Sequence, residues 1–353
     1  MAAGSFLIAA ACEEDTTVTP PPVPPQISHG PWYTKTFNSS GVQTGLQDND
    51  TWDILVRADN TVWIGNQGGI AIYPDLNTTA RSNAYNELNG LSNPKVRRML
   101  EFNNQIWVAT WGGGVNVYDV AGDTWTEYRA RLNNGLINDQ VSDIAQHNGL
   151  LYFATNGGVS IYDPVADTWG RFRTSDGLMV PFVSAVEVAT STGGQDLHWY
   201  GPRVEFGLDP SDLGTVGVTL ERPGMGVSNF TVLNSGLREP NVNDIFYDAA
   251  DDVTYLCLTT SGIARVDLNT ATWTYATRND GLPSDNTYSI TKVGGVLWVA
   301  TQNGIAKLQS NGRWQGYNRA GGLKADRVRR VYTDDPSRLW LNYIQSGAGR
   351  VTP

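Results

Sequence analysis

The sequence predicts an all-β protein in which seven similar units of four short antiparallel strands close into a ring. A Gly-Leu pair recurs along the chain, a second motif follows it at a fixed distance, and tight-turn residues separate short apolar runs. The leucines of the recurring pairs are Leu46, Leu91, Leu136, Leu178, Leu237, Leu282 and Leu323. A repeat of about 45 residues with four strands in each copy is typical of a seven-bladed β-propeller.

The third copy, residues 135–169, shows the pattern of one unit. It reads GLINDQVSDIAQHNGLLYFATNGGVSIYDPVADTW. Asn148-Gly149 and Asn156-Gly157-Gly158 are tight-turn sequences, because glycine tolerates the positive φ that two-residue hairpins need. We therefore expect strands over residues 141–145, 151–155 and 159–162, with a fourth beginning at Trp169.

The second motif marks the second strand of each copy. It begins at Trp63, Trp107, Tyr152, Trp298 and Trp340 in five copies, 16 or 17 residues after the leucine. The pattern is similar to the two-component regulator propeller family, whose repeats read GLxxNxV, LWVATxGGLxxYD and W. The resemblance covers residues 45–353 in seven copies. It implies a sensor-type extracytoplasmic propeller, and because the chain ends at Pro353 we expect a stand-alone, lipoprotein-like version without a kinase.

The N-terminal segment is interpreted as an export and anchoring region. Residues 1–12, MAAGSFLIAAAC, resemble a lipoprotein signal peptide, with Cys12 as the lipidation site. An unprocessed flexible N-terminus is the alternative. Residues 13–29 form an acidic, Pro- and Thr-rich tether, and residues 30–353 form the propeller. We expect an exported lipoprotein of the periplasm, outer membrane or cell surface, held to the membrane by the lipid alone.

Two copies depart from the repeat. The seventh copy lacks its last strand, whereas residues 31–37, PWYTKTF, supply a Trp and an aromatic pair before the first Gly-Leu. We expect this N-terminal strand to complete the last blade and leave no open sheet edge. The fourth copy is about 14 residues longer than the period and contains a Gly- and Pro-rich excursion after His198-Trp199-Tyr200-Gly201. Such an insertion either lies on the binding face or is neutral loop drift.

Composition excludes several functions. A net charge of -10 argues against nucleic acid as a partner. The three histidines do not form an HExxH motif or a pair at metal-ligand spacing, and there is no GxSxG motif. We therefore expect no metal, no cofactor and no catalytic residue. Cys257 lies in an apolar run and is expected to be buried, and the chain is expected to be a monomer.

Seven positions after each leucine, on the innermost strand, five of the seven copies carry a charged residue. The seven positions hold Asp53, Arg98, Asp143, Ala185, Asp244, Ser289 and Arg330. Their signs alternate around much of the ring, which favours ion pairs between blades. A central site for an ion or polar ligand is the alternative, with Asp244 left without a basic neighbour.

Two tryptophans do not belong to the recurring core positions. The repeated Trp of the second and fourth strands is expected to be core, whereas Trp111 replaces a polar hairpin residue and Trp52 precedes the inner-strand Asp53. Four arginines, Arg97, Arg98, Arg329 and Arg330, occupy first-strand positions of the copies on either side. Together these residues predict a pocket for an anionic or carbohydrate-like ligand.

The leading functional hypothesis is a non-enzymatic binding or sensor module of the bacterial envelope, taking a small molecule, a glycan or an envelope protein. The first alternative is a scaffold in an envelope or secretion assembly. The second is a lyase or hydrolase that would need Asp143 or Asp244 beside a histidine. Propellers carry many unrelated functions, so these alternatives depend on the geometry of the site.

Overall fold

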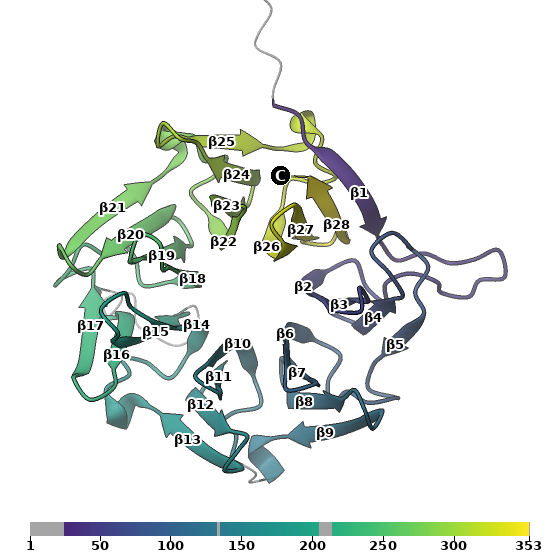
Figure 1. Ribbon diagram of the computed structural model, residues 1–353, viewed down its shortest axis with the longest axis horizontal. Helices are drawn as coiled ribbons and strands as arrows, with labels where there is room; N and C mark the ends of the chain where they lie inside the picture. The colour runs from purple at the N-terminus through teal and green to yellow at the C-terminus, as the bar shows by residue number, and fades with distance from the viewer. Residues whose placement is uncertain (1–24, 133–134, 205–213, 353) are drawn as a thin grey trace, which may run out of the picture.

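The computed structural model describes residues 25–132, 135–204 and 214–352. Seven four-stranded antiparallel sheets stand around a common axis, which confirms the seven-bladed β-propeller (Figure 1). Within the described ranges, the only helical elements are single 3-10 turns, and none is long and apolar enough to cross a membrane. These turns include η1 (Ala130–Leu132), η2 (Thr174–Asp176), η4 (Arg278–Asp280) and η5 (Arg319–Gly321).

Each blade runs from an inner strand beside the axis to an outer strand at the edge of the disc (Figure 1). Blade 1 holds β2 (Thr51–Val56), β3 (Val62–Asn66), β4 (Gly69–Tyr73) and β5 (Asn83–Tyr85). Blade 2 holds β6 (Val96–Phe102), β7 (Gln105–Thr110), β8 (Gly114–Asp119) and β9 (Thr124–Tyr128). Blade 3 holds β10 (Val141–His147), β11 (Leu150–Thr155), β12 (Gly158–Asp163) and β13 (Thr168–Phe172), so its four predicted strands are confirmed.

The remaining blades repeat this order. Blade 4 holds β14 (Val183–Thr190), β15 (Asp196–Pro202), β16 (Gly217–Arg222) and β17 (Gly226–Thr231). Blade 5 holds β18 (Val242–Asp248), β19 (Val253–Leu258), β20 (Ile263–Asp267) and β21 (Thr272–Ala276). Blade 6 holds β22 (Thr287–Val293), β23 (Val296–Thr301), β24 (Gly304–Leu308) and β25 (Trp314–Tyr317). Blade 7 holds β26 (Val328–Asp335), β27 (Arg338–Tyr343), β28 (Ala348–Thr352) and the N-terminal β1 (Ser28–Tyr33).

The N-terminal strand closes the ring, as predicted. β1 pairs antiparallel with β28, with Tyr33 opposite Ala348 and Trp32 opposite Gly349. Tyr33 is fully buried and packs against Tyr73 of blade 1. The strand begins at Ser28, inside the range assigned to the tether. Cys12, the signal peptide and the tether up to residue 24 lie outside the described residues.

The recurring Gly-Leu pair has a structural cause. All seven leucines are buried. Gly135 has φ +100°, and a Cβ atom there would lie 2.1 Å from the Cγ of Trp169. Only glycine tolerates both the left-handed backbone and this close approach. The glycines of three copies, Gly90, Gly135 and Gly236, are therefore packing partners of the outer-strand tryptophans Trp125, Trp169 and Trp273 of the blade that follows.

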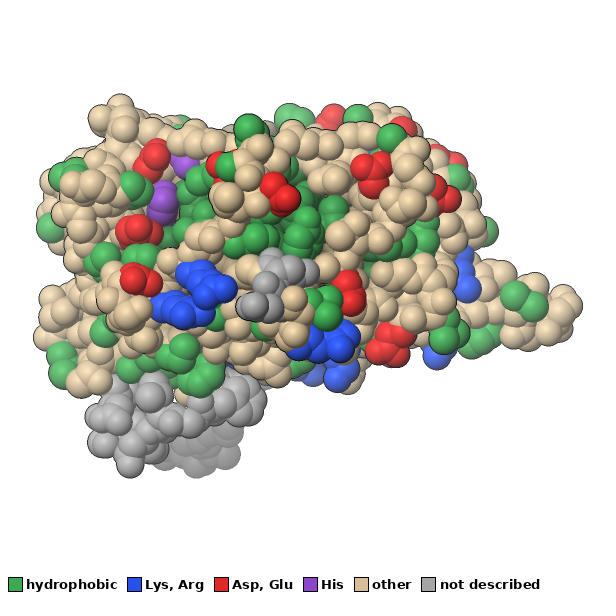
Figure 2. Space-filling view, turned by 90° about the horizontal axis from the view of Figure 1, so that it is seen from below, with side chains coloured by type: hydrophobic (Ala, Val, Ile, Leu, Met, Phe, Trp, Pro, Cys, Tyr) green, Lys and Arg blue, Asp and Glu red, His purple; other side chains and the backbone are tan. Residues whose placement is uncertain are grey.

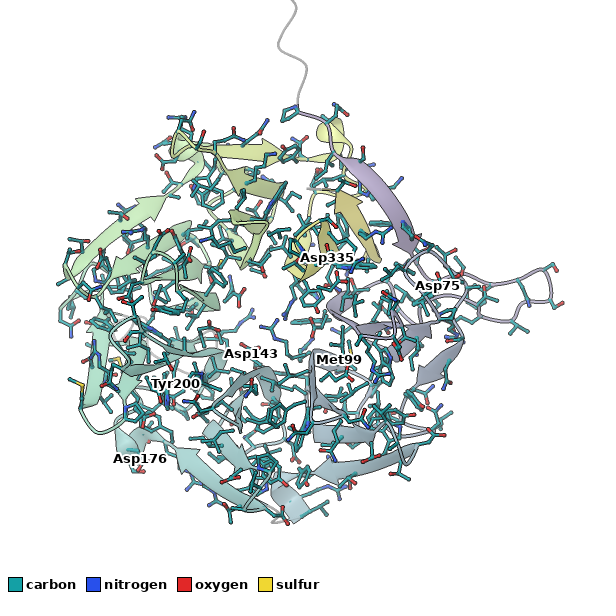
Figure 3. All side chains as sticks on the ribbon, in the orientation of Figure 1. Asp75, Met99, Asp143, Asp176, Tyr200 and Asp335 are labelled. Carbon is teal, nitrogen blue, oxygen red and sulfur yellow. The ribbon has the colours of Figure 1, made fainter. Side chains whose placement is uncertain are left out.

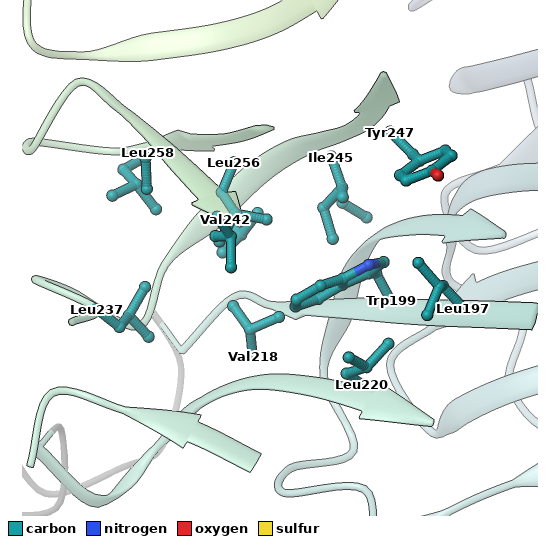
Figure 4. Packing of buried hydrophobic residues seen from close by; sticks show 13 residues of the cluster. Leu197, Trp199, Val218, Leu220, Leu237, Val242, Ile245, Tyr247, Leu256 and Leu258 are labelled. Atoms are coloured by element: carbon teal, nitrogen blue, oxygen red, sulfur yellow. The ribbon is translucent and has the colours of Figure 1, made fainter. Parts of the chain in front are cut away.

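The hydrophobic core lies between neighbouring blades rather than within one sheet. Between blades 4 and 5, Trp199 packs with Val218 and Leu220 on one side and with Val242 and Ile245 on the other (Figure 4). Cys257 is completely buried, as expected. Around the edge of the disc, acidic, basic and apolar side chains are interspersed (Figure 2).

The fourth copy differs in part from the sequence interpretation. The Gly- and Pro-rich excursion was expected to be a loop, but its second half forms β16, which pairs with β17 and in part with β15. In GVTLER, the apolar Val218 and Leu220 alternate with Thr219 and Glu221, as a strand requires. The extra length falls mainly between β15, which ends at Pro202, and β16, which begins at Gly217, and partly in the longer connection between β14 and β15. Residues 205–213 lie outside the described residues.

Candidate functional site at the channel mouth

Every inner strand carries a β-bulge at the same place. In blade 1, Thr51 pairs with Asn66 and Asp53 with Gly65, so Trp52 is the extra residue. The same register shift occurs in all seven blades. A bulge re-aims one side chain of a strand. The seven re-aimed residues are Trp52, Arg97, Ser142, Ser184, Asn243, Tyr288 and Arg329.

These seven residues line one pocket at the mouth of the central channel. Its volume is about 880 Å³, within the range of pockets that hold small-molecule ligands. A second group of lining residues follows the second strands of five blades: Trp111, Asn156, Arg203, Thr259 and Ile344. A third group precedes the inner strands: Gln140, Phe182, Asn286 and Arg327. The pocket therefore lies on the face where strands two and three are joined.

Six of the predicted site residues meet here. Trp52, Trp111, Arg97, Arg98, Arg329 and Arg330 all line the pocket. The guanidinium carbons of Arg97 and Arg329 lie 3.4 and 3.6 Å from the ring centroid of Trp52. Two guanidinium groups this close to one centroid cannot share a face of the ring. Trp52 is therefore enclosed on both faces by cations and offers no face to a sugar ring.

Arg97 is a buried charge of the pocket without a carboxylate in contact among the described residues. Its guanidinium lies 5.2 Å from the ring centroid of Trp111 as well as against Trp52. Among the described residues it forms no ion pair, and its buried Nη1 has no hydrogen-bond partner. Burial, with the positive charges of Arg329 and Arg203, lowers its pKa to about 9. An anion entering the pocket would supply the missing partner.

Arg329 differs because it already has a carboxylate. Its Nη2 lies 2.9 Å from Oδ1 of Asp50, and its Nη1 donates to the carbonyl of Thr51. Burial nevertheless lowers its pKa to about 10, opposed by Asp50. The pair fixes Arg329 against blade 1 and keeps one face of Trp52 covered.

Ion pairs form the floor of the pocket. Arg98 of blade 2 bonds Asp143 of blade 3 at 2.5 Å and lies 3.9 Å from Asp244 of blade 5. Arg98 therefore spans the channel between blades 2 and 5. Its partner Asp143 is labelled in Figure 3 and lies beside the channel. The expectation that Asp244 lacks a basic neighbour was wrong. It considered adjacent blades only, whereas an arginine side chain is long enough to cross the axis.

The other members of the predicted ring are arranged between blades. Arg330 lies 3.1 Å from the carboxylate of Asp53, which is fully buried and also accepts the backbone N–H of Met99. Burial raises the pKa of Asp244 to about 6, and Arg98 opposes this shift. The ring thus contains the inter-blade ion pairs that the alternating signs predict.

Two arginines of the pocket were not predicted. Arg203 and Arg327 are exposed at its rim, on blades 4 and 7. Arg203 lies four residues after the second-strand Trp199, just as Trp111 lies four residues after the second-strand Trp107. The two residues therefore hold the same repeat position. Arg327 lies four residues after Leu323. Aligning every repeat position, rather than the charged inner-strand position alone, would have found both.

The histidines belong to another part of the molecule. Nε2 of His147 lies 3.1 Å from Oδ1 of Asp196, and Nδ1 of His198 lies 3.3 Å from Oε2 of Glu221. Neither histidine lines the pocket, whereas Asp143 and Asp244 are held by Arg98. The acid and histidine pair required by the lyase or hydrolase alternative is therefore not assembled by these groups.

Comparison with models of protein families and with curated proteins finds no match. Among solved structures, the extracellular domain of a protein assigned as a hybrid two-component system from B. thetaiotaomicron superposes with TM-score 0.69 at 17% identity, over 91% of this chain and 42% of its own. A second B. thetaiotaomicron extracellular domain, assigned to a one-component system, gives 0.67 at 14% identity, over 92% and 39%. YCF48 bound to D1 peptide gives 0.62 at 12% identity, over 95% and 100%.

These likenesses establish the propeller fold. The chain spans about two fifths of the length of the two B. thetaiotaomicron domains. Both neighbours are extracellular domains of regulatory proteins, the class to which the repeat resemblance points.

Proposed function

We propose that this protein is a non-enzymatic, extracytoplasmic binding propeller of the sensor type that captures an anionic ligand at the mouth of its channel. The uncompensated guanidinium of Arg97, held in the pocket by Trp52, carries this proposal. The surrounding charge supports it. Six arginines and two aspartates line the pocket of a chain whose net charge is -10.

The enclosure of Trp52 favours an anion over a neutral sugar. A sugar-binding tryptophan presents a free ring face to the ligand, and here Arg97 and Arg329 occupy both faces. The indole instead holds two like charges in place by cation–π contact. Export and a lipid anchor at Cys12 complete the proposal and rest on the N-terminal sequence.

A peptide-binding scaffold is the second candidate. It is supported by the likeness to YCF48, whose structure contains a D1 peptide. In that case a protein partner would be held by contacts beyond the pocket, and binding would survive the loss of Arg97. Capture of a partner from envelope extracts by the wild type and by Arg97→Gln in equal amounts would favour the scaffold.

The test is anion binding by the purified chain. Tripolyphosphate is titrated at constant ionic strength, with tryptophan fluorescence as the readout because Trp52 and Trp111 line the pocket. We expect saturable binding that Arg97→Gln weakens by about tenfold or more, the value of a charge-assisted hydrogen bond. Arg171→Gln, which removes an exposed arginine from β13, should bind as the wild type does. Absence of binding, or equal binding by both variants, would contradict the proposal.

A further inference from the structure

The pocket has a positive side and a side that accepts hydrogen bonds. Arg97 lies on β6 of blade 2, against the ring of Trp52. Asn243 is on β18 of blade 5, and Asn286 directly precedes β22 of blade 6. Blades 5 and 6 lie across the channel from blade 2 (Figure 1). A ligand that crosses the channel therefore meets a guanidinium at one end and two carboxamides at the other.

The two carboxamides present oxygen atoms that need donors. Asn243 donates its Nδ2 to the carbonyl of Thr287 at 2.7 Å, which leaves Oδ1 as its remaining acceptor. Oδ1 of Asn286 is buried and has no hydrogen-bond partner among the described residues. A buried acceptor without a donor costs about 1–3 kcal/mol. A ligand that donates N–H groups here would remove that cost.

Carboxylates add negative charge to the accepting side. Asp244 directly follows Asn243 and lines the pocket. It shares the single guanidinium of Arg98 with Asp143, so two carboxylates face one cation. Burial raises the pKa of Asp244 only to about 6, and its carboxyl is therefore largely ionised at pH 7.5. An ammonium group suits this side better than a hydroxyl, because it supplies donors and positive charge together.

Between the two ends, blade 3 offers a donor and an acceptor side by side. Nδ2 of Asn156 donates to Oε1 of Gln140 at 2.6 Å, which leaves Nε2 of Gln140 and Oδ1 of Asn156 for a ligand. One peptide unit has the matching pair, a C=O that accepts and an N–H that donates. A backbone bridge joins Gln140 to Trp111, whose ring lies beside Arg97. The pair therefore adjoins the positive side of the pocket.

On the basis of the proposed anion site, we infer that the ligand is a short peptide with free ends. Its carboxylate pairs with Arg97, and its ammonium group is held by the oxygen atoms of Asn243 and Asn286. A peptide unit between the ends pairs with Gln140 and Asn156. The volume of about 880 Å³ accommodates several peptide units. Because both ends are bound, the site selects fragments over intact chains.

Three forms of triglycine test this inference, since they share one backbone and differ in the charges of their ends. Triglycine has both charges, N-acetyl-triglycine has the carboxylate alone, and triglycinamide has the ammonium group alone. Each is titrated into the purified chain at pH 7.5 and constant ionic strength, with tryptophan fluorescence as the readout. We expect triglycine to bind at least tenfold more tightly than either blocked form.

Variants of Asn286 test the accepting side. Asn286→Leu removes the acceptor at similar size and should reduce the preference for triglycine over N-acetyl-triglycine by about fivefold or more. Asn286→Asp adds a carboxylate and should increase the preference, a gain that misfolding cannot produce. Asn279→Leu, at an exposed position of η4 outside the pocket, should keep the wild-type preference. Arg97→Gln should weaken both peptides, because each carries the carboxylate.

The outcomes separate the two proposals. If N-acetyl-triglycine binds as tightly as triglycine, or if both Asn286 variants keep the wild-type preference, the peptide inference is wrong while the anion site stands. The peptide inference is also wrong if tripolyphosphate binds and triglycine does not. If neither tripolyphosphate nor triglycine binds the wild type, the anion site itself is wrong.

Discussion

Trp52 shows how one residue keeps two like charges close together. Its ring lies between Arg97 and Arg329, and only Arg329 has a carboxylate partner, Asp50. Each cation–π contact contributes roughly 0.5–2 kcal/mol, which offsets part of the repulsion and part of the cost of burial. The tryptophan therefore stabilises a charged state that the rest of the pocket leaves uncompensated.

Glu187 is a second ionisable group whose burial has a cost. It lies two residues beyond Ala185 on the inner strand of blade 4, and it accepts the backbone N–H of Tyr247. Burial raises its pKa to about 8, Asp244 and Asp143 add to the shift, and Tyr247 and Arg98 oppose it. The folded protein thus holds a proton on Glu187 at pH values where the unfolded chain has released it.

Replacing Glu187 by Gln should therefore stabilise the protein at high pH. The protonated carboxyl of Glu187 is the form that the folded protein favours. Its contribution to the free energy of unfolding is complete below the unfolded pKa of about 4 and is lost as the pH rises through the folded pKa of about 8. Glu187→Gln removes this loss. Urea unfolding should show an advantage over the wild type that grows by about 1–3 kcal/mol between pH 5 and pH 8.5.

The exposed Glu87 supplies the control for that experiment, because Glu87→Gln should leave the pH dependence unchanged. An advantage of Glu187→Gln that stays constant with pH, or shrinks as the pH rises, would contradict the assignment.

The sequence alone predicts that the residues at the mouth of the pocket lie together, but it does not predict the ion pairs at the floor. Trp52, Arg97 and Arg329 each lie six residues after a repeat leucine, so a common position in the fold follows from the register. The contact of Arg98 with Asp244 joins blades 2 and 5. That contact depends on the width of the channel and on the reach of one side chain, which a repeat pattern does not contain.

At the scale of the element, the recurring motifs predict the strands well because each motif residue has one structural task. The hydroxyl of Thr110, the last residue of the motif that begins at Trp107, donates a hydrogen bond to the carbonyl of Gly114 across the hairpin. Thr155 donates to the carbonyl of Gly158 in the same way. The motif is irregular in the fourth copy, and there the third strand, β16, was not foreseen. Its identification needs the pairing with β17, which only the folded sheet supplies.

The N-terminal strand should be essential for stability. A chain that begins at residue 35 lacks β1, so β28 becomes an open edge and the burial of Trp32 and Tyr33 is lost. Loss of a buried aromatic side chain costs about 3–5 kcal/mol. We expect the melting temperature to fall by roughly 10 °C relative to a chain that begins at residue 25. Equal melting temperatures would show that the ring does not depend on this closure.

At the scale of the whole molecule, the ring is held in two ways. Apolar side chains pack between neighbouring blades all around the disc, and the ends of the chain are joined by β1 and β28. Arg98 adds a contact across the axis, from blade 2 to Asp244 on blade 5. A link of this kind restrains the separation of blades that share no packed surface.

Removal of Arg98 should therefore destabilise the entire ring. Arg98→Met leaves Asp143 and Asp244 buried without their cation, and breaking a buried pair from one side costs about 3–5 kcal/mol. The loss should be smaller at pH 5 than at pH 8. Burial raises the pKa of Asp244 to about 6, so at pH 5 its carboxyl is largely neutral and needs the arginine less.

Urea unfolding of Arg98→Met at the two pH values measures this effect, with Arg171→Met as the control for loss of an exposed arginine. Adding Asp143→Asn and Asp244→Asn to Arg98→Met should recover part of the lost stability, because the uncompensated charges are then gone. A cross-channel link also predicts that the urea midpoints reported by the fluorescence of Trp52 in blade 1 and of Trp199 in blade 4 decrease together. Unchanged stability at pH 8, or a larger loss at pH 5, would mean that the ion pairs at the floor do not hold the ring.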